Sequence, residues 1–523
     1  MEDLIAPEIY NLTDEIEAFA RDPQRIALKF EDLKGETAEI TYADLIKRSN
    51  QLANGMLSKG LKKGDRILIM MPRSIETYIA YIASLKSGLV IIPSSEMLRA
   101  KDLSYRIQHA EVKAVLIHDD LADRVDKQDE KNLLLKVTTS PINKTGWVTL
   151  DEIMENQSKD QTPQIETRSD DMAFISYTSG TTGQPKGVVH THGWAYAHLR
   201  TASNSWMDIQ MGDMVWATAG PGWQKWLWSP FISTLGSGAT GFVYQGPFDP
   251  EVYLNLLDKY EINVLCCTPT EYRLMAKVDN LSAYHLGKLR SAVSAGEPLN
   301  REVIDIFKEY FDIDVRDGYG QTENTLLVGT VKGMEAKPGS MGKPTPGNLV
   351  EIITEEGEAA DVGEIGDIAV HRSTPALFKE YFKDPERTKA AFRGDYYVTG
   401  DKAKKDKDGY FWFEGRGDDI IISSGYTIGP FEVEDALVKH SKVKECAVVA
   451  SPDEIRGNIV KAFVILKNPD DACEKNLVKE LQDHVKTLTA PYKYPRKIEF
   501  VKDLPKTTSG KIRRIELRQR ESI

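Results

Sequence analysis

The polar side chains with the clearest chemical meaning lie in the stretch YTSGTTGQPKGV, residues 177–188, directly after an apolar run at residues 173–176. Its hydroxyls and its one ammonium can donate hydrogen bonds and charge to an anion: Thr178, Ser179, Thr181, Thr182 and Lys186. Its glycines allow close backbone approach to that anion: Gly180, Gly183 and Gly187. This composition predicts a phosphate-binding loop, with a flexible linker as the alternative. A Walker A loop is disfavoured, because Lys186 is followed by Gly rather than by Ser or Thr.

Four further motifs follow in order: YGQTE (319–323), TGD (399–401), GRGDDIIISSGY (415–426) and PKTTSGKIRR (505–514). Together with the first loop they resemble the adenylate-forming superfamily, which comprises acyl-CoA synthetases, luciferases and the adenylation domains of peptide synthetases. Two more segments, GYTIGPFEVE (425–434) and TAPYKYPRKIEFV (489–501), resemble its medium-chain acyl-CoA synthetase subgroup. The resemblance runs nearly from end to end of the chain.

Joining a carboxylate to ATP brings an anion beside a polyphosphate, so the site has to neutralise charge and hold the reacting atoms in line. Thr322 offers a hydroxyl near the α-phosphate, and Glu323 offers an oxygen ligand for Mg²⁺. The resemblance implies that Asp401 binds the ribose with help from Arg416. It also implies that Lys511, on a mobile domain, catalyses the first half-reaction. Taken alone, Glu323 and Lys511 would be interpreted as solvated surface charges.

Two glycine-containing segments, SAGEP (294–298) and DGYGQ (317–321), resemble those that enclose adenine in this superfamily. Glycines and a flat tyrosine ring permit close stacking on a base. The nucleotide-binding residues expected here are Gly296, Glu297, Pro298, Asp317, Gly318, Tyr319, Gly320 and Gln321, with Thr322 beside them.

The acyl pocket is expected in PGWQKWLWSPF (221–231) and directly after YGQTE. Trp223, beside Gly222, matches a family position that lines the acyl tunnel. Apolar Leu326 and Leu327 would suit an aliphatic tail. Trp226 and Trp228 are interpreted rather as core residues.

For CoA, the subgroup resemblance points to a loop and a basic cluster: Ser424, Gly425, Tyr426, Arg456, Lys493 and Arg496. A solvated surface is the alternative for the cations. Thr427 stands where close relatives commonly carry arginine, so the chain lacks one cation near this loop.

The elements that position these motifs alternate along the chain, with β-branched runs followed by segments of helical period. Residues 66–70 predict a strand, and Ser74 predicts the cap of a helix that continues to Leu85. The fold class is α/β, with a large N-terminal body of helix-covered sheets and a small, mobile α+β C-terminal domain. We expect the N-terminal domain to span residues 1–416 and the C-terminal domain 417–523, with a hinge near Asp418.

The chain has 523 residues, with 67 Lys and Arg against 79 Asp and Glu, a formal net charge of −12. This balance disfavours nucleic-acid and anionic-membrane partners. No apolar run is long enough to span a bilayer, and the four cysteines have no metal-ligand or disulfide spacing. We therefore expect a cytoplasmic protein whose partners are ATP, CoA and a small carboxylic acid, with Mg²⁺ as cofactor and a homodimer as an open alternative to the monomer.

These observations predict an AMP-forming acyl-CoA synthetase for short to medium, including branched, fatty acids. Three alternatives stay open. One is adenylation with a carrier protein or oxygen as the acceptor. Another is acetate or an aromatic acid as the substrate. The third is a nonenzymatic nucleotide-binding regulator.

Overall fold

The structure is a computed structural model of the chain that describes residues 2–178, 185–296, 299, 301–423, 426–453, 456–506 and 511–521. The chain forms two compact units. Unit 1 comprises Met1–Ala336, Pro344–Leu349 and Arg372–Phe392, and unit 2 comprises Lys337–Lys343, Val350–His371 and Arg393–Ile523. The short strands β16 (Lys343–Pro344) and β20 (Phe392–Arg393) lie where the chain passes from one unit to the other.

The first sheet of unit 1 has the strand order β19-β9-β8-β4-β3-β5-β6-β7. Strands β8, β4, β3, β5 and β6 are parallel, whereas β9 pairs antiparallel with β8. Strands β3, β4 and β5 are almost fully apolar, as expected for strands covered on both faces. The strand predicted at residues 66–70 is confirmed. Its strands are β3 (Arg66–Met70), β4 (Val90–Pro93), β5 (Ala114–Ile117), β6 (Leu135–Thr138), β7 (Val148–Thr149), β8 (Met172–Thr178), β9 (Lys186–Thr191) and β19 (Glu380–Tyr381).

The second sheet of unit 1 contains the order β15-β14-β13-β12-β10-β11-β1-β2. Neighbours from β13 through β12, β10 and β11 to β1 are parallel, whereas β15 and β2 pair antiparallel. The strands are β1 (Ile26–Asp32), β2 (Thr37–Thr41), β10 (Met214–Ala217), β11 (Thr240–Gln245), β12 (Val264–Cys267), β13 (Ser291–Ala295), β14 (Val315–Gly320) and β15 (Leu326–Gly329).

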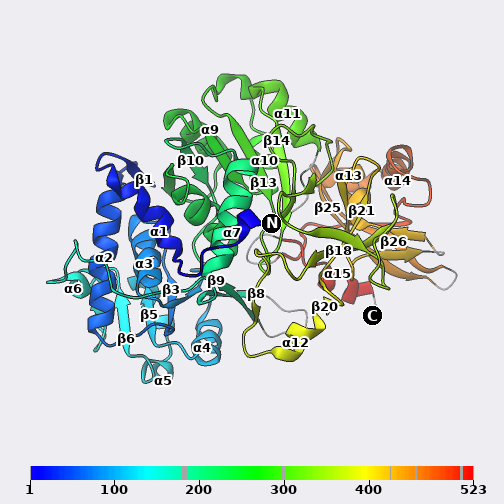
Figure 1. Cartoon of the computed structure of the whole chain (residues 1–523). Helices are drawn as coiled ribbons and strands as arrows, with labels where there is room; N and C mark the ends of the chain where they lie inside the picture. Colours follow the sequence, from blue (N-terminus) through cyan, green and yellow to red (C-terminus); the bar gives the residue numbers. More distant parts are fainter. Residues whose placement is uncertain are drawn as a thin grey trace. The chain divides into compact units, whose positions relative to one another are not determined.

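Helices pack on these sheets, and α2 and α3 lie side by side near β3 (Figure 1, blue). The predicted cap at Ser74 is confirmed, because its hydroxyl accepts from the Thr77 N–H at the start of α3. The α-helices of unit 1 are α1 (Leu12–Glu17), α2 (Tyr42–Ser58), α3 (Ile75–Lys86), α4 (Ala100–His109), α5 (Lys127–Glu130), α6 (Leu150–Met154), α7 (His192–Ala202), α8 (Gln224–Trp226), α9 (Pro250–Lys259), α10 (Pro269–Met275), α11 (Arg301–Phe311) and α12 (Pro385–Ala390). Shorter or wider helical turns are η1 (Glu2–Leu4), η2 (Ala18–Arg21), η3 (Asp119–Arg124), η4 (Ser203–Met207), η5 (Leu227–Ser233) and η6 (Leu281–Ala283).

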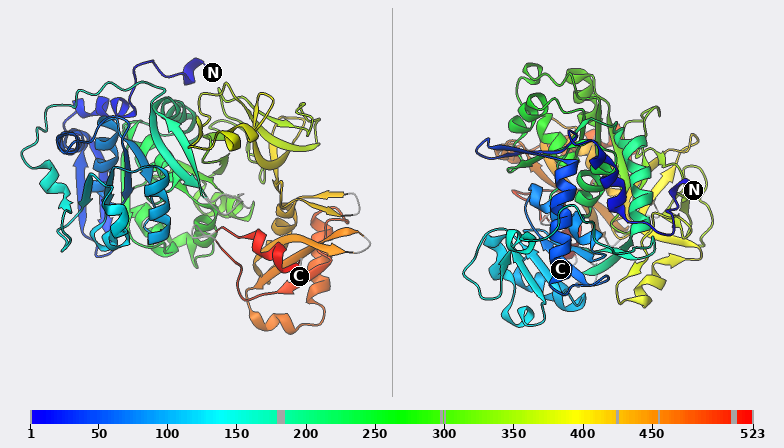
Figure 2. Two further views of the ribbon diagram at one scale, coloured as in Figure 1. Left: turned by 90° about the horizontal axis from the view of Figure 1, so that it is seen from below. Right: turned by 60° about the vertical axis from the view of Figure 1, so that its left-hand side comes forward.

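Unit 2 begins with an antiparallel sheet that contains β17, β18, β21 and β22 and continues into a smaller α+β part (Figure 2, orange and red). There, α13 and α15 pack on β25, and α14 packs on α13. The strands are β17 (Val350–Ile353), β18 (Ile365–His371), β21 (Tyr396–Lys405), β22 (Phe411–Arg416), β23 (Ile421–Ser423), β24 (Tyr426–Ile428), β25 (Val443–Asp453), β26 (Gly457–Leu466) and β27 (Lys497–Phe500). The helices are α13 (Pro430–Val438), η7 (Pro469–Cys473), α14 (Leu477–Leu488) and α15 (Arg514–Glu521).

The expected fold class, a sheet-rich α/β body with a smaller C-terminal domain, is confirmed. The domain boundary after residue 416, the hinge and the mobility of the C-terminal part stay predictions. Within the described residues, no helix is long and apolar enough to cross a membrane.

Candidate active site

The expected phosphate loop joins two antiparallel strands of unit 1, β8 and β9, whose register pairs Thr178 with Lys186. Ser179, Gly180, Thr181, Thr182 and Gly183 lie outside the described residues. Among the described residues, the buried hydroxyl of Thr178 has no hydrogen-bond partner. A buried polar atom without a partner costs free energy, so a ligand at this loop would satisfy it. The strand ends therefore suit the anion site that the sequence predicts.

Lys186 and Glu323 form an ion pair beside this loop, with 2.5 Å from Nζ to Oε1. Tyr381, on β19, donates its hydroxyl hydrogen to the same Glu323 oxygen at 2.9 Å and accepts from Lys186 Nζ at 2.9 Å. The Glu323 carboxylate is buried, with 6% of the residue exposed. The carboxylate charge is thus compensated by one cation and one hydrogen bond from a hydroxyl, which offsets the free-energy cost of burying it.

Tyr381 is a member of this group that the sequence reasoning missed. It reaches Lys186 and Glu323 because β19 pairs with β9, with Tyr381 opposite Val188. The neighbouring Phe378 N–H donates to the Glu323 carbonyl at 2.7 Å. The segment around β19 therefore contacts both the backbone carbonyl and the side-chain carboxylate of Glu323. No local sequence pattern predicts that β19 pairs with β9, because about two hundred residues separate the two strands.

The two segments expected to enclose adenine lie at the carboxyl ends of adjacent parallel strands, β13 and β14, where Ser294 pairs with Asp317. Gly296 follows β13 with φ +110°, a conformation that favours glycine. Glu297 and Pro298 lie outside the described residues. Gly320 cannot carry a side chain without meeting the Thr325 carbonyl. These segments therefore lie side by side, as the predicted base site requires.

Asp317 is buried on β14, where it accepts hydrogen bonds from the N–H groups of Gly318 and Leu299. Burial raises the pKa of its carboxyl to about 7. Gly318 and Tyr319 pair with Gly329 and Val328 of β15. The end of β14 is thus fixed by strand pairing on both sides.

The expected acyl-pocket residues lie on different elements of unit 1. Gly222 has φ +88°, and a Cβ there would strike the backbone at Ser94 and Ser95. Trp223 precedes α8 and is half-buried. Leu326 and Leu327 are fully buried on β15. Trp226 stacks on Phe231 at 5.4 Å between ring centroids, so its interpretation as a core residue fits its packing.

In unit 2, Asp401 on β21 lies opposite Arg416 on β22, with 4.0 Å between Oδ1 and Nη1. Asp401 is 6% exposed, and its N–H donates to Thr399 Oγ1. Arg416 Nε also donates to Asp418 Oδ1 at 3.4 Å. Arg518 of α15 pairs with Asp418 at 3.2 Å. The predicted ribose-binding residues, Asp401 and Arg416, and the predicted hinge residue, Asp418, thus belong to one network of ion pairs.

The expected CoA-binding cations of unit 2 have protein partners. Lys493 Nζ lies 2.5 Å from Glu432 Oε2, Arg456 Nη1 lies 4.0 Å from Asp453 Oδ1, and Arg496 donates to the Tyr494 hydroxyl. Ser424 and Gly425 lie outside the described residues, as does the side chain of Thr427.

Tyr426 is 52% exposed and stacks on Tyr492 at 4.3 Å between ring centroids. This pair is an aromatic platform suited to a base or a flat ligand. Lys511 is exposed, and the residues 507–510 before it are outside the described part. After it, α15 is anchored by a 2.7 Å ion pair between Arg514 and Glu434.

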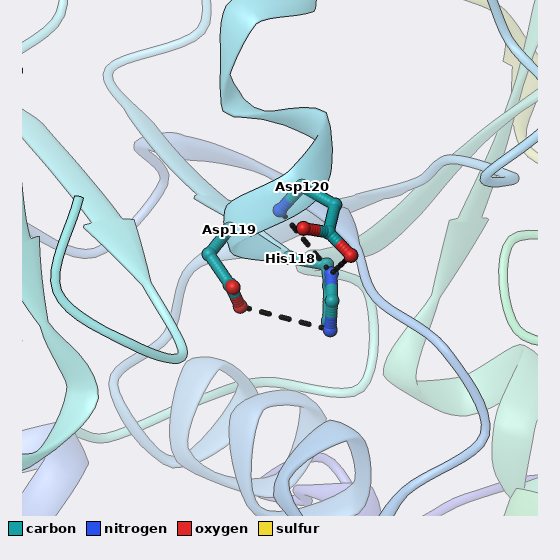
Figure 3. Close-up of side chains that lie close together, drawn as sticks. All are labelled: His118, Asp119 and Asp120. Atoms are coloured by element: carbon teal, nitrogen blue, oxygen red, sulfur yellow. Dashed lines mark hydrogen bonds and ion pairs between the residues drawn. The ribbon is translucent and has the colours of Figure 1, made fainter. Parts of the chain in front are cut away.

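Two places in unit 1 offer oxygen or nitrogen atoms that could hold a metal ion. Glu323 offers a buried carboxylate next to the phosphate loop, which fits the hard oxygen donor that Mg²⁺ prefers. His118, Asp119 and Asp120, at the end of β5, also bring ligand atoms within 4.8 Å of one another (Figure 3). There His118 Nδ1 accepts from the Asp120 N–H, and Asp119 accepts from the Thr139 hydroxyl at 2.5 Å. These bonds make the second group a self-contained turn, and we assign no metal to it.

The two-unit α/β fold and these groups indicate a nucleotide-binding enzyme that activates its substrate with ATP. Comparison with known proteins confirms this class. The family model of the AMP-binding enzyme matches residues 16–382, and that of the AMP-binding enzyme C-terminal domain matches residues 432–511. The chain belongs to the AMP-binding enzyme family.

The chain is 62% identical over 520 residues to an uncharacterized acyl-CoA ligase, YtcI, of Bacillus subtilis (strain 168), covering 99% of this chain and 98% of the relative. It is 43% identical over 501 residues to the mitochondrial acyl-coenzyme A synthetase ACSM3 of Mus musculus, covering 94% of this chain and 86% of the relative. A crystal structure of the anthranilate CoA ligase AuaEII in complex with anthranoyl-AMP matches with a TM-score of 0.88 at 27% identity, covering 99% and 98% of the two chains. The predicted superfamily, its medium-chain acyl-CoA synthetase subgroup and the enzyme class, an AMP-forming acid–thiol ligase, are confirmed.

Proposed function

We propose that this chain converts a carboxylic acid, ATP and CoA to acyl-CoA, AMP and pyrophosphate, and that its acids are short- to medium-chain fatty acids, branched ones included. First, a carboxylate oxygen forms a bond to the α-phosphorus while the bond to the pyrophosphate oxygen breaks. Then the CoA sulfur forms a bond to the acyl carbon, the bond to the AMP oxygen breaks, and the thiol gives up its proton. The observation that carries this proposal is the group of Lys186, Glu323 and Tyr381 beside the phosphate loop.

In the first step, the Lys186 ammonium neutralises charge on the phosphates of ATP, and the loop hydroxyls donate hydrogen bonds to them. The Thr322 hydroxyl donates a hydrogen bond to the α-phosphate. The Lys186–Glu323 ion pair opens so that the ammonium can turn to the nucleotide, while Tyr381 keeps its bond to Glu323. Glu323 would hold Mg²⁺, which when bound neutralises charge on the polyphosphate. Asp401 and Arg416 bind the ribose, and residues 294–298 and 317–321 hold the adenine.

For the acid, Trp223 and Gly222 shape the entrance and Leu326 and Leu327 line the floor of the acyl pocket. For the second step, Ser424, Gly425 and Tyr426 line the channel for CoA, and Arg456, Lys493 and Arg496 contact its phosphates after exchanging their present carboxylate or hydroxyl partners. Lys511 serves the first step only. The C-terminal domain, residues 417–523, turns about Asp418 between the steps.

ATP and CoA are supplied in the cytoplasm, where we place the enzyme. The four cysteines fit a reducing compartment because all of them are free thiols and three are buried. Whether the enzyme works as a monomer or as a homodimer is a question for light scattering.

A substrate panel tests the acid assignment. Pyrophosphate release is measured with CoA present and absent, for straight acids from acetate to dodecanoate and for branched and aromatic acids. The proposal predicts CoA-dependent acyl-CoA formation with a maximum among butyrate to decanoate, each methylene changing kcat/KM by about tenfold or more. A maximum at acetate or at an aromatic acid would overturn the chain-length assignment. Adenylate formation without transfer to free CoA would favour a carrier-protein acceptor.

A further inference from the structure

Three buried aromatic rings follow the phosphate loop at a spacing of four residues: His190, at the end of β9, and Trp194 and His198, on α7. Each is at most 1% exposed. Their rings stack in sequence, with centroids 4.0 Å and 5.4 Å apart and interplanar angles of 28° and 18°. We name these three residues the ring ladder. Neither phosphate binding nor the acyl pocket accounts for it.

Each ring of the ladder makes a hydrogen bond to the turn at residues 322–325, which connects β14 to β15. His190 Nε2 lies 2.5 Å from the Thr322 carbonyl oxygen, and Trp194 Nε1 donates to the Asn324 carbonyl at 2.9 Å. His198 Nδ1 lies 2.7 Å from Thr325 Oγ1. Since Glu323 lies between these anchored residues, the ladder fixes the backbone on both sides of it.

The protonation of the two histidines follows from their partners. A carbonyl oxygen only accepts, so His190 carries its hydrogen on Nε2. His198 Nε2 lies 3.2 Å from the Trp228 carbonyl, so His198 also carries its hydrogen on Nε2 and accepts the Thr325 hydroxyl hydrogen on Nδ1. Burial lowers the pKa of both histidines to about 3. Both rings are therefore neutral at all working pH values.

The turn needs such partners because it is irregular backbone inside the protein. Asn324 and Thr325 are fully buried, and buried carbonyl groups outside strand pairing require donors from elsewhere. His190 and Trp194 supply such donors from the end of β9 and from α7, and regular elements are a more rigid support than a loop. His198 also links the turn to the Trp228 carbonyl in the segment expected to border the acyl pocket.

We propose that His190, Trp194 and His198 are positioning residues that set the orientation of Thr322 and Glu323 toward ATP. The inference rests on the proposed function, in which those two residues contact the nucleotide phosphates and the metal. The ladder touches no reacting atom. Its effect passes through the backbone of residues 322–325.

The test compares variants that keep or remove a single donor. His190→Gln retains an N–H near the position of Nε2, whereas His190→Leu removes it. Trp194→Phe keeps an aromatic ring, although a smaller one, and removes the N–H, so it replaces His190→Leu if that variant fails to fold. The matched control is His192→Leu, because His192 is equally buried on α7 but accepts from the Leu12 N–H, away from the turn. The readouts are the ATP dissociation constant without acid at several Mg²⁺ concentrations, acid-dependent ATP–pyrophosphate exchange, and the melting temperature.

We expect His190→Leu and Trp194→Phe to weaken ATP binding and to lower the exchange kcat by about tenfold or more, because misplaced catalytic groups lose rate steeply. His190→Gln should stay within about threefold of the parent protein. His192→Leu should lower the melting temperature without changing either ATP parameter. The proposal is overturned if His190→Leu and His192→Leu both change only the melting temperature, or if His190→Gln is as impaired as His190→Leu. If the parent protein shows no exchange with any acid, the proposed function fails, and the ATP titration alone still decides the role of the ladder.

Discussion

Two places in unit 1 contain the same three side-chain types, a buried glutamate bonded to one lysine and one tyrosine. In the first, Glu323 is held by Lys186 and Tyr381. In the second, Glu31 on β1 is held by Lys259 at 2.6 Å and by the Tyr260 hydroxyl. The glutamates are equally buried, at 6% and 7% exposure. Composition alone therefore does not distinguish a site from a structural ion pair.

The surroundings of the two groups differ. Lys259 and Tyr260 are neighbours in sequence at the end of α9, and the Lys259 side chain is 54% exposed. Its hydrogen bond to Glu31 raises the pKa of Lys259, as expected of a satisfied surface pair. Lys186 is only 23% exposed, and its register partner is Thr178, whose hydroxyl is unsatisfied among the described residues. Within the described part of the chain, an unsatisfied hydroxyl therefore lies at the register partner of Lys186, whereas Glu31 is paired with a surface lysine and a tyrosine hydroxyl.

The largest effect is expected for Lys511, the proposed catalytic residue of the first step. Lys511→Ala should slow adenylate formation by about a thousandfold, because it removes charge that stabilises the transition state. Thioester formation from supplied acyl-adenylate should persist. Each half-reaction is measured separately, with Lys506→Ala as the control, since Lys506 pairs with Glu445 nearby. An equal loss in both half-reactions would contradict domain alternation.

Substituting the glutamates tests the comparison itself. Glu323→Gln should lower kcat/KM for ATP by about a hundredfold and raise the Mg²⁺ concentration needed for half-activation, because a charged oxygen ligand is lost. Glu31→Gln should leave both values unchanged and reduce the free energy of unfolding by about 1 to 3 kcal/mol. Steady-state kinetics and urea unfolding measure the two effects. Equal kinetic losses in the two variants would contradict the distinction between a ligand site at Glu323 and a structural ion pair at Glu31.

The lysines should differ in nucleotide binding. Lys186→Met should weaken ATP binding by about tenfold to a hundredfold, since it removes a charge-assisted contact and leaves Glu323 buried without its cation. Lys259→Met should bind ATP normally, because its partner Glu31 retains the Tyr260 hydroxyl. Calorimetric titration with ATP measures both constants. Tight ATP binding by Lys186→Met would remove the basis for a phosphate role.

The smallest effect is expected from the tyrosines. Tyr381→Phe should raise the Mg²⁺ requirement and lower the exchange rate by about threefold to tenfold, because Glu323 loses one hydrogen bond but keeps its position through the Phe378 N–H. Tyr260→Phe should change only stability. Exchange rates across a Mg²⁺ series provide the measurement. A Tyr381→Phe enzyme that needed no more Mg²⁺ than its parent would show that the hydroxyl has no positioning role.

Much of the fold could be predicted because its signals are local. The strand at residues 66–70 and the cap at Ser74 both occur where periodicity and capping residues indicate. The helix expected to continue to Leu85 occurs as α3, Ile75–Lys86. Helix ends shift by a few residues because the terminal turns depend on tertiary contacts.

The candidate site was less predictable where it depends on long-range pairing. Glu323 and Lys186 belong to recognisable motifs, but Tyr381 joins them only through the pairing of β19 with β9. The ring ladder could not be predicted from the sequence, because histidines and tryptophans at helical spacing usually indicate core packing. Their bonds to the turn at residues 322–325 become visible only in three dimensions.

One experiment tests directly whether the enzyme forms an acyl-adenylate intermediate and passes its acyl group to CoA. Acid-dependent exchange of labelled pyrophosphate into ATP is measured without CoA, and AMP and acyl-CoA are then quantified after CoA is added. The account predicts exchange that requires the acid but not CoA, followed by equal amounts of AMP and acyl-CoA. Absence of exchange with every acid, or AMP formed in the presence of CoA without acyl-CoA, would contradict it.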